Sequence, residues 1–123
     1  MQLLAVHRGG TLIQALDPAD GHGAPRAEAR HAVHLEAGST LRAAYDAPTI
    51  VVVSAHRQAV GALPPEVRVT ARAADGCVEG IEVEGAVGVQ WHPEAADDGG
   101  ALYRWLVRTA LNSARSARRG SRA

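Results

Sequence analysis

The sequence predicts a layered fold that mixes α-helices and β-strands, in the α/β or α+β class. The run Thr49–Val53 is β-branched throughout, which is typical of a buried strand. The dipeptide Asp75-Gly76 stands between two strand-like runs and predicts a hairpin turn. The segment Ala101–Ala114 predicts an amphipathic helix, because the spacing i, i+3 and i+4 gives it an inner face of Leu102, Trp105, Leu106, Thr109 and Ala110. We therefore expect an antiparallel hairpin beside a partly parallel sheet, followed by a C-terminal helix.

The first half of the chain is expected to hold two short helices and a strand. The segment Met1–Arg8 is apolar, then basic, and stops at two glycines, which is typical of the end of a helix. The segment Asp17–Arg30 is rich in Pro, Gly, Asp and Ala and predicts a surface loop. The alternation in His31–Leu35 predicts a short strand, and Ser39 is a suitable N-cap for a helix over Thr40–Tyr45.

The second half is expected to add helical turns and three strands. We expect one or two helical turns over His56–Leu63, ended by a pair of prolines. The segment Val67–Arg72 alternates, which predicts a strand with Thr70 on the face opposite its valines. The segments Cys77–Val83 and Val87–Trp91 are predicted as two further short strands.

Length and composition indicate an ordinary globular chain. The 123 residues fit one small domain or one piece of a larger domain. Hydrophobic residues make up 46% and charged residues 21%, which excludes a disordered or collagen-like chain. Phe is absent, so any core must rely on Val, Leu, Ile and Ala. We expect a domain over residues 1–114 with a marginal core.

The charge balance shifts toward the C-terminus, although the whole chain is formally neutral. The last twenty residues carry no acid and several arginines: Arg104, Arg108, Arg115, Arg118, Arg119 and Arg122. Such a segment can contact nucleic acid or an anionic membrane, but a solvated basic end is the commoner case. We expect residues 115–123 to form a basic disordered tail, with neither nucleic acid nor a membrane as partner.

Several classes of site are not expected. Cys77 is the one cysteine, so an internal disulfide and a Cys-rich zinc site are excluded, and a cytoplasmic location fits. No run of 18 apolar residues indicates a membrane span. His31 and His34 would point to opposite faces of a strand, and no Cys or acidic partner completes a metal site. A metal site is therefore not expected.

The sharpest chemical signal is the pair His92 and Glu94 at the end of an apolar strand. Pro93 between them favours an extended backbone, in which residues i and i+2 point the same way. A carboxylate beside an imidazole fixes its tautomer and stabilises the imidazolium, as a general base requires. A solvated His and Glu at a strand end is an equally good interpretation of the pattern alone.

A His-Glu pair needs a nucleophile, and the sequence offers no convincing one. A reactive thiolate needs a helix N-terminus or a nearby cation, and Cys77 follows a tight turn that supplies neither. Ser39 and Ser54 are hydroxyl candidates, but neither lies in a G-x-S-x-G elbow. We therefore expect Cys77 to be a structural residue.

Several segments, in one order, resemble one family. The matching segments are MQLLAVHRGGTLIQ at residues 1–14, the H-x-V-x-L-x-x-G-S-x-L run at 31–41, VSAHRQAV at 53–60, RVTARAADGCVEGIE at 68–82, and GVQWHPE at 88–94. Together they resemble the class I glutamine amidotransferase-like γ-glutamyl hydrolases, and most closely the γ-glutamyl-γ-aminobutyrate hydrolase type. The match extends over about residues 1–111.

The resemblance implies the C-terminal part of a doubly wound α/β domain with a Cys-His-Glu triad. The family cysteine lies on a strand-to-helix elbow in a G-x-C-R-G context, followed by M-Q-L-L. The nucleophile and the elbow are therefore expected just before Met1, outside this sequence. Three positions depart from the family pattern, namely Ala15, Val53 and Arg57, and they bear on substrate preference more than on fold.

The resemblance also implies roles for individual residues. His92 corresponds to the general base and Glu94 to its orienting partner. Ser54, His56 and Gln58 correspond to a segment near the family's active site, which implies a substrate-binding role. The implied substrate is glutamine or a γ-glutamyl amide, and the implied reaction is thiolate attack, release of the amine and hydrolysis of the acyl-enzyme. Neither a metal nor an organic cofactor is implied.

Without a nucleophile we expect this chain alone to be inactive. The alternatives are a pseudoenzyme or interaction module and the C-terminal half of a split glutamine amidotransferase. In the split enzyme, a separately encoded N-terminal half would rebuild the site. Self-association is the other expected partnership, because half of a doubly wound sheet exposes an edge and faces. A hydrolase and an ammonia-channelling amidotransferase share the same triad, and the motifs do not separate them.

Overall fold

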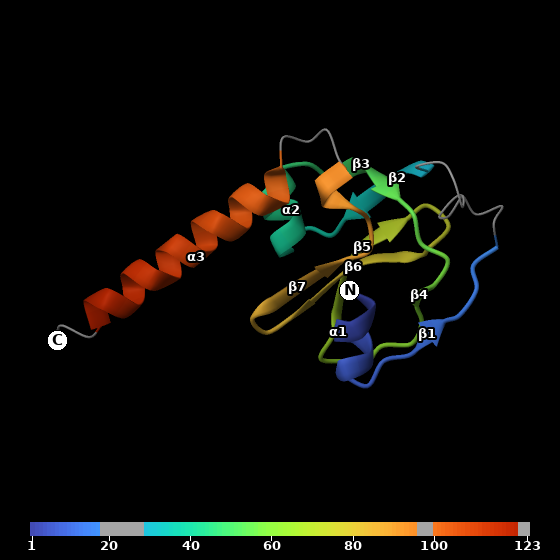
Figure 1. Ribbon diagram of the computed structural model, residues 1–123, viewed down its shortest axis with the longest axis horizontal. Helices are drawn as coiled ribbons and strands as arrows, with labels where there is room; N and C mark the ends of the chain where they lie inside the picture. The colour runs from blue at the N-terminus through green and yellow to red at the C-terminus, as the bar shows by residue number, and fades with distance from the viewer. Residues whose placement is uncertain (18–28, 96–99, 121–123) are drawn as a thin grey trace.

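The centre of the computed structural model is a five-stranded sheet, with strand order β3-β2-β5-β6-β7 (Figure 1). The structure describes residues 1–17, 29–95 and 100–120. The strands are β2 (Ala29–Leu35), β3 (Thr49–Ser54), β5 (Arg68–Ala73), β6 (Val78–Val83) and β7 (Ala86–Val89). Every neighbouring pair in this sheet is antiparallel.

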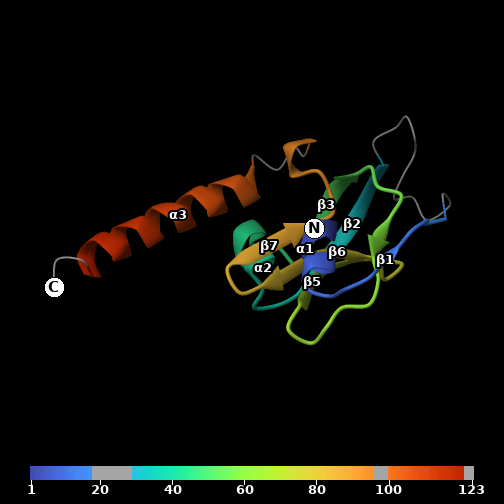
Figure 2. The same ribbon diagram turned by 60° about the horizontal axis from the view of Figure 1, so that its bottom comes forward.

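A second layer packs under the sheet and contains helix α1 (Gln2–His7). A small sheet of β1 (Leu12–Ile13) and β4 (Ala59–Val60) flanks the helix. Their apolar side chains form one core with the sheet, made of Ala5, Val60, Val67, Val78 and Ile81, with Met1, Leu4 and Leu63 at its margin. The layer places the start of the chain beneath β6 and β7 (Figures 1 and 2).

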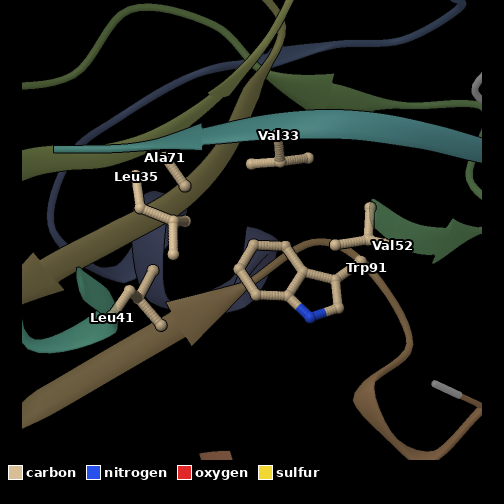
Figure 3. Close-up of a cluster of buried hydrophobic side chains, with 6 residues drawn as sticks. All are labelled: Val33, Leu35, Leu41, Val52, Ala71 and Trp91. Carbon is tan, nitrogen blue, oxygen red and sulfur yellow. The ribbon is translucent and has the colours of Figure 1, made fainter. Parts of the chain in front are cut away.

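A second core contains Trp91 and helix α2 (Thr40–Tyr45). Figure 3 shows the indole ring with Val33 and Val52 on one side and Leu35, Leu41 and Ala71 on the other. Trp91 is 3% exposed, so its indole ring fills the core with a large aromatic side chain in a sequence that has no Phe. The residue directly before His92 is thereby fixed in the core.

Most predicted elements are confirmed, with small shifts at their ends. The Ser39 hydroxyl caps α2 by accepting the Arg42 N–H at 3.0 Å. The hairpin turn between β5 and β6 has Gly76 at φ +89°, a conformation that favours glycine. Of the predicted loop Asp17–Arg30, residues 18–28 lie outside the described ranges, and Arg30 belongs to β2.

The prediction of helical turns over His56–Leu63 is wrong. This segment contains no helix, and within it Ala59–Val60 forms β4. The Gly61 N–H donates to Thr11 O at 2.8 Å, and the Thr11 N–H donates to Ala62 O at 2.9 Å. Pairing with a distant strand therefore satisfies backbone groups that a short helix would have satisfied locally.

The expected side-chain alternation of β5 is also wrong in part. Strict alternation places Val69 and Ala71 on one face, but Val69 packs against the core that contains Ala5 and Ile81, whereas Ala71 belongs to the core that contains Trp91. The register against β6 shifts between Val69 and Ala71 and again between Ala71 and Arg72. Such a bulge adds a residue to one strand, so side chains two positions apart no longer share a face.

No parallel pair occurs among the described strands, so the expected parallel part of the sheet is not found in these ranges. Parallel neighbours need crossover connections of a dozen or more residues, and β5, β6 and β7 follow one another through short turns. The mixed α/β character and the C-terminal helix are as predicted.

Helix α3 spans Ala101–Gly120, past the end expected at Ala114. Residues 115–120 of the expected tail are thus helical, and the division into a domain and a tail stays a prediction. The inner face was expected to hold Leu102, Trp105, Leu106, Thr109 and Ala110, of which Leu102 and Trp105 are half-buried and the others exposed. In both views α3 leaves the body beside α2, so no described element covers its later turns (Figures 1 and 2).

Candidate functional site

His92 lies just beyond β7 and is anchored through its backbone. Its N–H donates to Val53 O at 2.9 Å, so the segment is tied to the end of β3. Pro93–Ala95 forms a single 3-10 turn, in which the Ala95 N–H donates to His92 O at 3.1 Å. The extended backbone expected between His92 and Glu94 is therefore wrong, and their side chains meet across a turn.

The two side chains nevertheless form the predicted pair. His92 Nδ1 lies 2.7 Å from Glu94 Oε1, and the side chains are 45% and 61% exposed. The hydrogen bond from His92 holds the pKa of Glu94 below its usual value. An ionised carboxylate can only accept, so Nδ1 carries the hydrogen and Nε2 of the neutral ring is the basic atom. Within the described ranges, Glu94 is the one polar partner of this ring.

Of the three predicted substrate-binding residues, Ser54 ends β3, and His56 and Gln58 lie in the connection to β4. Ser54 and His56 are buried. The His56 ring reaches Gln58 O with Nδ1 at 2.8 Å. Gln58 is partly exposed, and its side-chain amide donates to Gln14 Oε1 at 2.7 Å. Of the three, Gln58 is the residue with a side chain at the surface.

Behind this segment lies a buried carboxylate that no sequence motif indicated. Glu79 is 0% exposed, and its Oε1 lies 3.2 Å from His56 Nε2 and 3.3 Å from His31 Nε2. Burial alone raises the pKa of Glu79, but the hydrogen bonds and positive charge of the two imidazoles outweigh it and leave the pKa lowered. The available signal was an acid at a buried position of a predicted strand, which is rare without a partner.

A glutamine from α1 joins this segment to the end of β7. Gln2 Nε2 donates to Gln58 O at 3.2 Å and to Gln90 Oε1 at 3.3 Å. The Gln90 N–H donates in turn to Glu79 O at 2.8 Å. Gln2 and Glu79 therefore both hydrogen-bond to Gln90, which lies two positions before His92.

Cys77 lies elsewhere. It lines a cavity of ≈ 700 Å³ together with Leu16, Val60 and Pro64, and neither His92 nor Glu94 lines that cavity. Its N–H donates to Asp75 Oδ1 at 3.0 Å, which closes the hairpin turn. This placement agrees with a structural role.

Two further properties concern the described ranges alone. No helix there is long and apolar enough to cross a membrane. No group of three or more His, Cys, Asp or Glu side chains in these ranges is arranged to hold a metal ion.

The profile of the peptidase C26 family matches residues 1–94. The chain belongs to this family. The match contains the His92–Glu94 turn, the segment of Ser54 to Gln58 and Glu79. The resemblance to class I glutamine amidotransferase-like hydrolases is thereby confirmed.

Individual relatives agree with this assignment. A γ-glutamyl-γ-aminobutyrate hydrolase of Escherichia coli is 40% identical over 80 residues, which cover 62% of this chain and 32% of that protein. A glutamine amidotransferase-like protein of Rickettsia prowazekii is 34% identical over 93 residues, covering 70% of this chain and 33% of that protein. This C26 chain therefore spans about a third of the length of these relatives.

The fold of the C26 chain also resembles the folds of solved crystal structures. A crystal structure from Thermoplasma acidophilum, provisionally described as a GMP synthase subunit, superposes with a TM-score of 0.76 at 18% identity. The superposition covers 95% of this chain and 56% of that one. The likeness confirms the class I glutamine amidotransferase fold.

Proposed function

We propose that this chain supplies the acid-base part of an active site that hydrolyses γ-glutamyl amides. The observation that carries the proposal is the 2.7 Å contact between His92 Nδ1 and Glu94 Oε1. It leaves Nε2 as an accessible base, on a ring that is about half exposed. Identity of 40% with a γ-glutamyl-γ-aminobutyrate hydrolase supports the substrate class.

In the proposed reaction His92 moves protons and a cysteine from outside residues 1–123 is the nucleophile. Nε2 accepts the thiol proton as sulfur attacks the γ-carbonyl carbon, and Glu94 stabilises the imidazolium. The imidazolium then protonates the leaving amine as the C–N bond breaks. Nε2 next takes a proton from water, whose oxygen attacks the thioester carbon. The C–S bond then breaks, glutamate is released, and the imidazolium returns the proton to the sulfur.

The substrate is proposed to approach from the side of Gln58, whose side chain is at the surface. Ser54 and His56 lie behind it and are buried, so they support the segment from within. A substrate-binding role for the group therefore depends first on Gln58.

The isolated chain is predicted to be inactive because no thiol contacts the His92 ring among the described residues. Loss of an oxyanion donor alone costs about 10²–10³ in rate, and loss of a nucleophile costs more. Incubation with γ-glutamyl p-nitroanilide should therefore release no amine above background. Turnover that His92→Ala abolishes would contradict this expectation.

A chimera tests the positive part of the proposal. The region of the Escherichia coli hydrolase that ends with its nucleophile elbow is joined to residues 1–123, which supplies an elbow cysteine. We expect γ-glutamyl amide hydrolysis that falls at least about a hundredfold in His92→Ala. His34→Ala is the matched control, because His34 is exposed on β2, and it should leave the rate unchanged. An inactive chimera that is folded would count against the proposal.

An amidotransferase is the second candidate, favoured by the 34% identity with a glutamine amidotransferase-like protein. The same chimera separates the two. Preference for free glutamine over γ-glutamyl-γ-aminobutyrate would favour the amidotransferase, and the reverse preference would favour the hydrolase.

A further inference from the structure

Glu79 is a buried ionisable group that the proposed reaction does not use. It belongs to a closed ring of hydrogen-bonded residues, here called the Glu79 network: Glu79, His56, Gln58, Gln2 and Gln90. Its side chain reaches His56, His56 reaches Gln58 O, and Gln2 joins Gln58 O to Gln90. The Gln90 N–H closes the ring by donating to Glu79 O at 2.8 Å.

The hydrogen-bonding capacity of each atom restricts the protonation state of His56. Gln58 O is a carbonyl oxygen that only accepts, so His56 Nδ1 must donate across 2.8 Å. His56 Nε2 faces Glu79 Oε1 at 3.2 Å. An ionised carboxylate also only accepts, and then Nε2 must donate as well. Both ring nitrogens then carry hydrogen, and the ring is an imidazolium.

A buried pair of carboxylate and imidazolium is stable only if enough hydrogen-bond donors or positive charges surround the carboxylate. A lone buried carboxylate is strongly unfavourable, whereas one that meets cationic or N–H donors is tolerated. Glu79 has two imidazoles on one oxygen, since His31 Nε2 lies 3.3 Å from the same Oε1. The lowered pKa of Glu79 agrees with an ionised carboxylate in this setting.

We propose that Glu79 is a positioning residue that holds His56 as a buried imidazolium and thereby locks the 55–58 segment against the strand end that carries His92. Both nitrogens of the His56 ring are occupied in this arrangement. His56 therefore acts through the framework and does not bind substrate itself. Gln90 lies two residues before His92, so the network reaches the general base through the backbone.

The ring nitrogens of His56 provide a direct test in the chain as it exists. At pH 7, ¹⁵N spectra of histidine-labelled residues 1–123 should show both His56 nitrogens protonated, and Glu79→Gln should leave only one. Glu84→Gln, an exposed acid in the β6–β7 turn, is the matched control and should change nothing. A single protonated nitrogen in the unmodified protein would overturn the proposal, and this result needs no variant to fold.

The positioning role has a second readout, which rests on the proposed function. In the active chimera, Glu79→Gln should lower kcat/KM roughly ten- to a hundredfold, as expected when catalytic groups are misplaced. Glu84→Gln should keep the full rate. An unchanged kcat/KM in a folded Glu79→Gln chimera would overturn the link to His92. An inactive parent chimera would instead count against the proposed hydrolase, while the ¹⁵N result would still decide the state of His56.

Discussion

At the scale of single residues, the His92–Glu94 pair and the Glu79 network use carboxylates in opposite ways. Glu94 is largely exposed and holds one ring that remains open to solvent on its other nitrogen. Glu79 is fully buried and contacts two rings. The exposed pair suits proton transfer, and the buried group suits rigid support.

The exposed pair gives the first prediction at this scale. Glu94→Gln keeps the shape of the side chain but removes the charge that stabilises the His92 imidazolium. We expect kcat/KM of the chimera to fall by about 10²-fold or more. Steady-state amide hydrolysis measures the effect. A decrease below threefold would mean that Glu94 does not orient the base.

The buried carboxylate gives a prediction about acid stability. The folded-state pKa of Glu79 is lowered, so its contribution to stability is present above its ordinary pKa and is lost as the pH falls through the folded value. Glu79→Gln should cost about 1–3 kcal/mol at pH 7 and flatten the loss of stability in acid. Urea unfolding between pH 7 and pH 3 measures both. Parallel curves for the two proteins would contradict the lowered pKa.

The sequence revealed one of these residue groups and not the other, for a physical reason. His92 and Glu94 are two positions apart, so a local pattern is enough to pair them. Glu79, His31 and His56 come from two strands and a loop, and only the curled sheet brings them together. No local pattern contains that information.

At the scale of elements, the same distinction separates the correct predictions from the wrong ones. The hairpin at Asp75-Gly76 and the helix after Ser39 are determined by neighbours in sequence, and both are confirmed. The segment His56–Leu63 pairs with a strand far away in the sequence, which local propensity could not anticipate. The apolar periodicity of α3 likewise predicted a helix correctly, but it could not show that no described element covers the later turns.

The contact between α2 and the sheet yields a prediction at this scale. Gly80 in β6 leaves no room for a side chain, since an added Cβ would lie 2.6 Å from Leu41 Cδ1 and 2.8 Å from Ala71 Cβ. Gly80→Ala should push α2 away and destabilise the protein by about 1–3 kcal/mol. Urea unfolding at pH 7 tests this, with Glu84→Gln expected within about 0.5 kcal/mol of the parent. Unchanged stability of Gly80→Ala would show that α2 can shift without cost.

At the scale of the whole molecule, α3 has the fewest packing contacts with the body along its later turns, whose side chains are exposed. Leu106, Val107 and Leu111 are 55%, 58% and 56% exposed. A continuous apolar face of this kind on a projecting helix favours association. The body of the molecule, by contrast, has two well-defined cores.

This surface gives a prediction about self-association. The purified chain should form dimers or larger species as its concentration rises, and a Leu106→Glu/Val107→Glu variant should shift toward the monomer. Light scattering after size-exclusion chromatography measures the mass. Asn112→Ser on the same helix is the control and should behave as the parent. A parent that stays monomeric at all concentrations would contradict this expectation.

The double contact at Gln58 has a practical consequence for engineering. Its carbonyl oxygen accepts hydrogen bonds from Gln2 Nε2 and His56 Nδ1. Its partly exposed side chain donates to Gln14 Oε1. The anchoring atom is part of the main chain, so it persists whichever amino acid occupies the position. Libraries that randomise residue 58 can therefore explore new substrate preferences while the scaffold that aligns the catalytic histidine stays intact.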